Sequence, residues 1–520
     1  MAVDKESAAG TVAAIIALTA FSKALGLFRE SVVAACYGAG AVTDAYLVAG
    51  TVVALVLNLL GGRALGTAFI PVYAGIAASG AQWRAERFAG TVLLLSLAAF
   101  ILAAMACSAL APVLAGVVAP GFGVATGDMA VYFIRLLALG IPLLALVGFW
   151  SALLNLRGHF LVPAALGIPL NLAVAVLAWK SGAQPYGLAV GTLTGYLLQL
   201  LLLWLVLKKF RAPVFTRPHI REPGIFQMGG LLVPMVAGGL ITQFNPLVNR
   251  VVASGLPEGA ISALGYADRL IQVPLGLLVT AVITAGYPSL SRAFAGGNCR
   301  RAKEMVVAWS GILLYAVVPT ACFFALHSHC LVKLVFQRGA FTADAAAVTA
   351  GALFYFSLGL PCMAWGRLLA RAFYARRDAA TPMLIGICAV GVNIFFCLTL
   401  AGPMGPGGIA LATTLASFTG LLLLLACLGF KIGSVFNRQM RVKVLSISAA
   451  AAAQVLVMLA LSAPGDGVGE RSPAGSLCFL IINGTAGMLA YFLVTRFLRL
   501  EEAMLVTGWL KKAVSRRREK

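Results

Sequence analysis

Charged side chains inside long apolar stretches are the residues of this sequence best suited to bind a ligand. Eight basic residues fall in such stretches: Lys23, Arg29, Arg63, Arg135, Arg250, Arg269, Arg367 and Arg371. Three acidic residues accompany them: Glu30, Asp44 and Asp268. A charge at the centre of a bilayer costs at least about 2.5–3.5 kcal/mol, so these groups are expected to face a protein interior or a wet cavity. The surplus of positive charge predicts an anionic ligand. Arginine suits phosphate because its planar guanidinium donates two parallel hydrogen bonds.

The basic residues differ in strength as candidates for anion binding. Arg29 and Arg269 are the firmest candidates, and Lys23 and Arg63 are conditional ones. The other four lie near the ends of their stretches or share one helix face, so contact with lipid headgroups explains them about as well. Anion binding is therefore predicted first for Arg29 and Arg269.

Asp44 and Asp268 have two possible roles. They either neutralise nearby arginines, which we favour, or hold a coupling ion or a proton. We expect no cofactor, and a coupling ion or the membrane potential is left as the source of energy because no GxxxxGK[ST] nucleotide-binding motif is present. The segment His327-Ser-His329-Cys330 matches no strong zinc pattern, so no metal site is predicted.

The elements that carry these charges are predicted to be membrane-spanning helices. The chain has 520 residues, of which 61% are hydrophobic and 11% charged, and its mean hydropathy is +0.97. Soluble proteins have roughly 45–50% apolar and about 25% charged residues. The apolar runs are continuous rather than alternating, which favours helices over a β-barrel. The first residues lack a signal-peptide pattern, so the first span is expected to direct insertion.

About fourteen spans are predicted from the apolar runs. Their approximate limits are 8–36, 42–76, 88–118, 129–155, 160–179, 186–207, 224–253, 260–291, 305–336, 345–374, 380–400, 408–430, 444–463 and 475–498. Most Lys and Arg residues outside the spans then fall on one side, and only Lys180, Lys333, Arg338 and Arg471 fall on the other. The positive-inside rule places both termini in the cytoplasm of a bacterial inner membrane. The net charge of +22 therefore reflects topology and contact with membrane lipids, and no nucleic-acid partner is expected.

An internal repeat organises the predicted spans. Pro71, Pro142, Pro163 and Gly187 match Pro288, Pro361, Pro382 and Gly408 in similar local sequences, at nearly constant offsets of about 220 residues. This pattern predicts an N-lobe over 1–218 with six spans, a C-lobe over 219–435 with six more, and an addition over 436–520 with two spans and a basic tail. Because six is even, the copies are parallel. Transporters are often built from such repeats, with the substrate between the lobes.

Several motifs carry a family resemblance over essentially the whole chain. They are FSKALGLFRESVVAACYGAGAVTDAYLVAG (21–50), AFIP (68–71), GYADRLIQVPLG (265–276), YPSLSRAFAGGN (287–298), FQRGAFT (336–342) and FYARRDAATP (373–382). Together they closely resemble the MurJ/MviN family of lipid II flippases, in the multidrug/oligosaccharidyl-lipid/polysaccharide exporter superfamily. The resemblance implies fourteen helices, two lobes around a cationic cavity, and a groove for the lipid tail formed by the last two helices.

The resemblance also implies the substrate and the residues that bind it. The substrate would be lipid II, whose pyrophosphate is an anion, and members of the cell-wall synthesis machinery are left open as partners. Arg29, Asp44 and Arg269 match functionally important family positions in LFRE, TDAY and YADR. Lys23 stands where the family usually has arginine. Arg63 is hypothesised to replace the cations of the second span, because the family has adjacent arginines followed by Glu-Gly-Ala where this chain has Leu57-Asn58 and then Gly61-Gly62.

Alternative functions are kept open at this point. The altered second span leaves a different polyprenyl-pyrophosphate-linked sugar as an alternative substrate. A drug/cation antiporter is less favoured, because it would be expected to place acidic residues in its cavity. A membrane scaffold without transport is the third class, and we expect no enzymatic activity.

Overall fold

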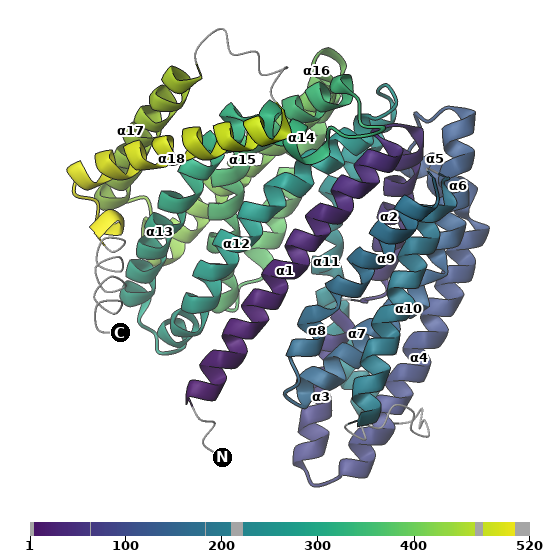
Figure 1. Ribbon diagram of the computed structural model, residues 1–520. Coiled ribbons are helices and arrows are strands. Elements are labelled where there is room, and N and C mark those ends of the chain that lie inside the picture. Colours follow the sequence, from purple (N-terminus) through teal and green to yellow (C-terminus); the bar gives the residue numbers. More distant parts are fainter. Residues whose placement is uncertain (1–4, 63, 183, 210–221, 463–471, 505–520) are drawn as a thin grey trace, which may run out of the picture. The chain divides into compact units, whose positions relative to one another are not determined.

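All regular secondary structure in the described part of the chain is helical. The computed structural model describes all residues except 1–4, 63, 183, 210–221, 463–471 and 505–520, and the described residues form helices without strands (Figure 1). The helices are α1 (Lys5–Tyr37), α2 (Ala41–Leu59), α3 (Ala64–Ala78), α4 (Gln82–Ala109), α5 (Ala111–Val118), α6 (Val124–Ala138), α7 (Gly140–Leu156), α8 (Leu161–Ala165), α9 (Gly167–Lys180), α10 (Tyr186–Lys209), α11 (Gly224–Ser254), α12 (Ala260–Ala295), α13 (Cys299–Leu326), α14 (Ser328–Phe336), α15 (Ala343–Ala375), α16 (Ala380–Ile432), α17 (Arg438–Leu461) and α18 (Pro473–Phe497).

Twelve helical segments of the described chain are long and apolar enough to cross a membrane. The all-helical, multi-pass fold is thus confirmed, whereas the number of fourteen spans stays a prediction. α1 covers the first predicted span but is not one of the twelve. Several predicted spans contain a break between two helices, such as α2 and α3 within 42–76. Hydropathy misses these breaks because each junction is only one to four residues long and lies within a long apolar run.

α16 covers two predicted spans and folds back on itself. A straight helix of its 53 residues would be about 80 Å long. Lys431 near its end nevertheless lies 2.8 Å (Nζ to Oγ1) from Thr381 near its start. The reversal occurs at Gly405, whose φ of 57° and ψ of −140° are not helical, between Pro403 and Pro406. The two arms therefore run side by side as a hairpin.

Helix boundaries repeat along the chain with the offset seen in the sequence. α4 and α13 begin 217 positions apart, at Gln82 and Cys299, and α5 and α14 keep the same spacing. α6 and α15 begin 219 positions apart, at Val124 and Ala343. The domain limits predicted above stay a prediction. By its internal contacts the chain divides into unit 1, residues 1–262 and 338–345, and unit 2, residues 263–337 and 346–520.

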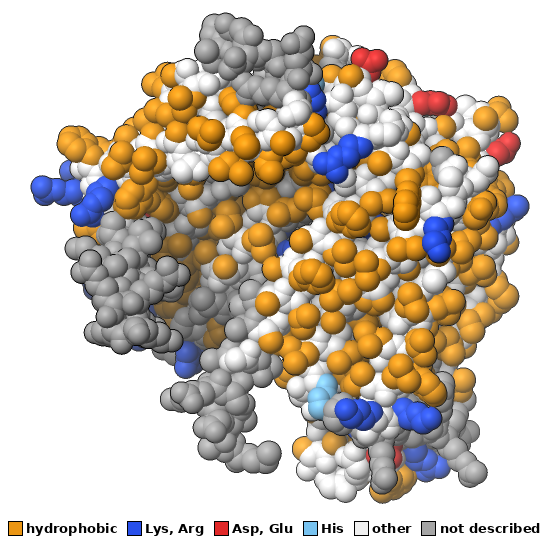
Figure 2. All heavy atoms as spheres, viewed as in Figure 1, with side chains coloured by type: hydrophobic (Ala, Val, Ile, Leu, Met, Phe, Trp, Pro, Cys, Tyr) orange, Lys and Arg blue, Asp and Glu red, His pale blue; other side chains and the backbone are white. Residues whose placement is uncertain are grey.

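Unit 1 has an aromatic core and a surface with many exposed apolar side chains. The ring of Phe69 on α3 lies 5.6 Å from Phe88 on α4 and 4.9 Å from Phe149 on α7, and all three are buried. Large hydrophobic side chains on the outer sides of α4 and α10 are exposed, including Leu102 and Trp204. Figure 2 shows this apolar surface over unit 1 and a gathering of Lys and Arg at the end of the unit near the α3–α4 connection. Exposed apolar surface of this extent marks a surface that contacts lipid.

In unit 2 the last two helices are held to α13 by polar contacts. Pro319 inside α13 lacks a backbone N–H, so the carbonyl of Tyr315, four residues earlier, has no helical donor. The hydroxyl of Tyr491 on α18 donates to that carbonyl at 3.0 Å, and Gln454 on α17 donates to the carbonyl of Pro319 at 3.0 Å. In a bilayer a backbone group needs such an internal partner. The α17–α18 pair is therefore an integral part of unit 2.

Candidate functional site

Arg29, the first predicted anion-binding residue, lies inside unit 1 and forms an ion pair. It sits on α1 with 17% of its side chain exposed, and one guanidinium nitrogen donates to the carboxylate of the adjacent Glu30, itself buried. An arginine has five N–H donors, so one bond to Glu30 leaves others for an anion. The pair lowers the cost of placing the charge within the membrane while keeping a cation at this depth.

Two tyrosines of unit 1 lie near enough to Arg29 to act on its charge. Tyr46 on α2 and Tyr196 on α10 lie within electrostatic range of its guanidinium. The hydroxyl of Tyr46 is 2.8 Å from the hydroxyl of Thr192, and the ring of Tyr196 packs on Gly140, where a Cβ would come within 2.8 Å of it. These contacts hold the side chains of Tyr46 and Tyr196 in place.

Of the two conditional candidates for anion binding, the structure describes Lys23 but not Arg63. Lys23 lies on α1, six residues before Arg29, and is half-buried. Within the described chain it forms no ion pair. Arg63, the hypothesised substitute in the second span, lies outside the described residues. Among the described residues before it, Gly61 has a φ of +72° and packs on Leu232 of α11.

Asp44 holds the start of α12. One of its carboxylate oxygens accepts a hydrogen bond from the backbone N–H of Gly259 at 2.7 Å. The other accepts from the N–H and the hydroxyl of Ser262, at 2.7 and 2.6 Å. Arg250 supports the same turn by donating to the carbonyl of Ile261 at 2.8 Å. A carboxylate at a helix N-terminus satisfies free N–H groups and interacts favourably with the helix dipole. Asp44 thus binds backbone N–H groups and the hydroxyl of Ser262, and Arg250 lies within electrostatic range of its carboxylate. Its predicted role in neutralising an arginine stays a prediction.

A second set of close contacts lies next to Asp44 and joins three distant segments. The N–H of Ala340 donates to the carbonyl of Ala35 at 2.8 Å. Gly339, with φ of +56°, has no room for a side chain, because a Cβ would lie 2.3 Å from the same carbonyl. Gly259 packs in the same way on the carbonyl of Ala39. We call Asp44, Gly259, Ser262, Gly339 and Ala35 the Asp44 cluster. It connects the α1–α2 turn, the start of α12 and the segment before α15.

The charges predicted in the eighth span lie in unit 2. Asp268 on α12 accepts a hydrogen bond from Gln272 at 3.1 Å (Oδ1 to Nε2), one turn further on. The Gln272 carbonyl oxygen is 3.5 Å from an Arg367 guanidinium nitrogen on α15. Arg269 on α12 is exposed. Asp268, Gln272 and Arg367 are thus brought together, with the glutamine between the carboxylate and the guanidinium.

The remaining charged candidates lie at exposed positions. Arg135 at the end of α6 is exposed, which agrees with contact to headgroups, and Arg371 on α15 lies over the ring of Tyr374 at 5.9 Å.

His327 is buried and lies 3.2 Å from Asn483 on α18 (Nε2 to Oδ1). Among the described residues no group of three or more His, Cys, Asp or Glu side chains could hold a metal ion.

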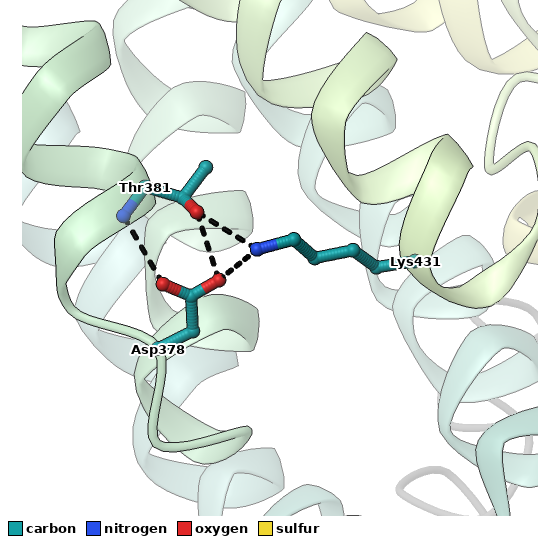
Figure 3. A network of polar contacts seen from close by, with 3 residues as sticks. All are labelled: Asp378, Thr381 and Lys431. Atoms are coloured by element: carbon teal, nitrogen blue, oxygen red, sulfur yellow. Dashed lines mark hydrogen bonds and ion pairs between the residues drawn. The ribbon is translucent and has the colours of Figure 1, made fainter.

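A polar network that the sequence did not indicate closes the α15–α16 turn (Figure 3). Asp378 accepts hydrogen bonds from the N–H and the hydroxyl of Thr381, at 3.1 and 2.8 Å, and from Lys431 at the far end of α16. Burial raises the pKa of Asp378, but the hydrogen bonds from Lys431 and Thr381 outweigh it and lower the pKa from 3.8 to about 2. Asp378 is therefore ionised and fully engaged at neutral pH.

The structural class follows from the fold. The chain aligns with a solved structure of a multidrug resistance MATE family transporter of the MOP superfamily at a TM-score of 0.67, with 14% identity, over 79% of this chain and 95% of that one. It aligns with a solved lipid II flippase MurJ, in an inward closed conformation, at a TM-score of 0.78, with 21% identity, over 93% and 98%. The fold is that of this group of multi-pass membrane transporters.

The family is narrower than the fold. The family described as lipid II flippase MurJ matches residues 33–467, and the chain belongs to this family. A probable lipid II flippase from Rhizobium meliloti is 33% identical over 321 residues, which cover 60% of each chain. One from Vibrio cholerae is 31% identical over 280 residues, or 53% of each chain. The matched region thus spans less than two thirds of the length of these relatives.

Proposed function

We propose that this protein moves lipid II, or a closely related polyprenyl-pyrophosphate lipid, from the cytoplasmic to the outer face of the cytoplasmic membrane. Membership of the lipid II flippase family supports the substrate, and the arginines within apolar helices are the observation that carries the proposal. The distribution of Lys and Arg supports a topology with both termini in the cytoplasm. The protein acts as a transporter and not as an enzyme.

The proposed role of the basic residues is to replace the water around the pyrophosphate. Arg29 in unit 1 and Arg269 in unit 2 bind the anion, with Lys23 and Arg63 as auxiliary cations. Charge-assisted hydrogen bonds from guanidinium groups are among the strongest that a site can offer to phosphate oxygens. At Arg29 the anion competes with Glu30, so the ion pair sets how tightly the headgroup is held and allows its release.

Asp44 and Asp268 have separate proposed roles. Asp44 stabilises the Asp44 cluster and so belongs to closure of one end of the pathway. Asp268 binds Gln272, which in turn binds Arg367, and in this way it holds the Arg367 guanidinium in position. The membrane potential or an ion gradient supplies the energy. In the proposed cycle the two repeats move against each other, so that the cations face each side of the membrane in turn.

The decisive experiment uses cells depleted of their own lipid II flippase and measures lipid II on the outer face. The wild-type chain is expected to restore outer-face lipid II, whereas Arg29→Ala and Arg269→Ala are expected to reduce it at least tenfold, which corresponds to about 1.4 kcal/mol of lost stabilisation. Arg135→Ala is the matched control, since it removes an exposed arginine. Equal activity of Arg29→Ala, Arg269→Ala and wild type would reject these sites.

The second candidate substrate is favoured by one observation, the second span with Leu57-Asn58 and Gly61-Gly62 in place of the usual arginine-rich motif. If the wild-type chain inserts correctly but fails to restore outer-face lipid II, the proposal shifts to another polyprenyl-pyrophosphate-linked sugar. A restored signal excludes this alternative.

A further inference from the structure

The turn after α15 contains an arginine in a backbone conformation that favours glycine. Arg377 has a φ of +64°, and among the described residues Arg499 is the one other non-glycine residue with positive φ. In this left-handed region the Cβ of an ordinary residue crowds the backbone, so glycine is the usual occupant after a helix end. A strained residue of this kind is a reason to look for a function.

The first repeat shows what this turn looks like without the strain. Gly158 follows α7 with φ of +79°, 219 positions before Arg377. The N–H of His159 donates to the carbonyl of Leu154 at 2.9 Å, and the N–H of Asp378 donates to the carbonyl of Phe373 at 3.0 Å. The bonds of Gly158 to Asn155 and of Arg377 to Tyr374 match as well. The same helix-ending turn thus exists twice in this chain, with glycine in one copy and arginine in the other.

The charge of Arg377 is not neutralised by the acid beside it. The carboxylate of Asp378 is occupied by Thr381 and Lys431 (Figure 3). The side chain of Arg377 is exposed, and it forms no ion pair or hydrogen bond with any residue that the structure describes. The network of Asp378 therefore holds the turn in place and leaves a full positive charge presented at the end of α15.

We propose that Arg377 is a first contact for the phosphate-bearing headgroup of the transported lipid at the cytoplasmic end of unit 2. The inference rests on the proposed function, which places this turn on the cytoplasmic side. A guanidinium at the headgroup level attracts phosphate oxygens and can bind them bidentately. In this proposal the contact with the headgroup offsets the cost of the left-handed backbone conformation at Arg377.

The test is binding of lipid II to the full-length protein in nanodiscs of zwitterionic phosphatidylcholine. Arg377→Gly is expected to unfold at a temperature no lower than wild type, because glycine relieves the strain, and to bind lipid II about 3- to 10-fold more weakly. Arg377→Lys keeps the charge and is expected to stay within about 3-fold of wild type.

Arg499 provides a matched control for the same charge in the same conformation. It follows α18 with φ of +55°, its turn has the same hydrogen bonds, and its side chain is exposed. Arg499→Gly is expected to bind lipid II as wild type does. A parallel titration with phosphatidylglycerol separates the substrate headgroup from bulk anionic lipid, and Arg377→Gly is expected to leave that binding unchanged.

Three outcomes would overturn the inference. They are wild-type affinity of Arg377→Gly for lipid II, an equal loss in Arg377→Gly and Arg499→Gly, and an equal loss for lipid II and phosphatidylglycerol. If wild type binds lipid II and Arg29→Ala weakens binding while Arg377→Gly does not, this inference alone fails. If wild type does not bind lipid II, the proposed function fails together with it.

Discussion

Among single residues, Asp378 is expected to make the stability of the fold depend on pH. Its pKa is lowered to about 2, because the hydrogen bonds from Lys431 and Thr381 favour the ionised form more than burial disfavours it. A group whose pKa is lower in the folded state stabilises the fold fully above its ordinary pKa, and this contribution is lost as the pH falls toward the lowered value. The relevant window is therefore about pH 4 to pH 2.

We predict that the unfolding temperature of wild type in detergent falls between pH 4 and pH 2 by more than that of Asp378→Asn. At pH 7 the variant is expected to be the less stable protein, because Lys431 loses its carboxylate partner. Thermal unfolding across this pH range is the measurement, and Asp344→Asn at the start of α15 is a control for the loss of one carboxylate. Parallel curves for wild type and Asp378→Asn would contradict the assignment.

Residue types were predictable from the sequence, but their partners were not. Arg29 stood out as a cation in an apolar stretch, yet adjacent residues on a helix do not usually face each other, so its bond to Glu30 had no spacing signal. Asp44 binds Gly259 and Ser262, which are more than 200 positions away. Lys431 lies just after the predicted span 408–430, and the reversal of α16 brings it to Asp378.

Among whole elements, α13 depends on a helix that lies far along the chain. The hydroxyl of Tyr491 occupies the carbonyl that Pro319 leaves without a helical donor. Tyr491→Phe is expected to lower the free energy of unfolding by about 1–3 kcal/mol, the cost of a buried group left without a partner. In a Pro319→Ala background the same change is expected to cost less, since the alanine restores a backbone N–H donor. Unfolding measurements on the four proteins of this double-mutant cycle give the coupling, and a coupling near zero would reject the explanation.

The elements themselves were largely predictable, and the exceptions share a cause. Long apolar runs predicted the membrane helices, because hydropathy depends on length and composition alone. The junctions between α6 and α7 and between α13 and α14 stayed hidden, because Leu139 and His327 interrupt the helices for about one residue each. The hairpin in α16 could be expected from Pro403, Gly405 and Pro406, whose backbone preferences favour a turn.

At the scale of the whole molecule, the Asp44 cluster contains the last residue of the first segment of unit 1 and part of its second segment. Unit 1 ends at Ser262 and resumes at Arg338, and both segments contact the α1–α2 turn. The proposed alternating access requires some contacts to separate in part of the cycle, and the Asp44 cluster, which lies within unit 1, is our candidate for such a contact. Gly339 and Gly259 pack so closely on backbone carbonyls that neither position has room for a side chain.

We therefore predict that fixing the cluster stops transport. Cysteines replacing Ala35 and Ala340 in a cysteine-free background, joined by a short bifunctional thiol reagent, are expected to abolish outer-face delivery of the substrate. The same double variant without the reagent is the control and is expected to transport normally. Undiminished transport after complete cross-linking would show that the cluster stays closed throughout the cycle.

The bond from Tyr491 to Tyr315 also has a consequence for how the protein is made. The two residues are 176 positions apart, so α13 is synthesised and enters the membrane well before its partner exists. Until α18 arrives, the carbonyl of Tyr315 in α13 has no donor from the finished fold, so α13 completes its hydrogen bonds only after α18 is made. A premature stop codon near the end of the gene would thus damage a helix in the middle of the protein.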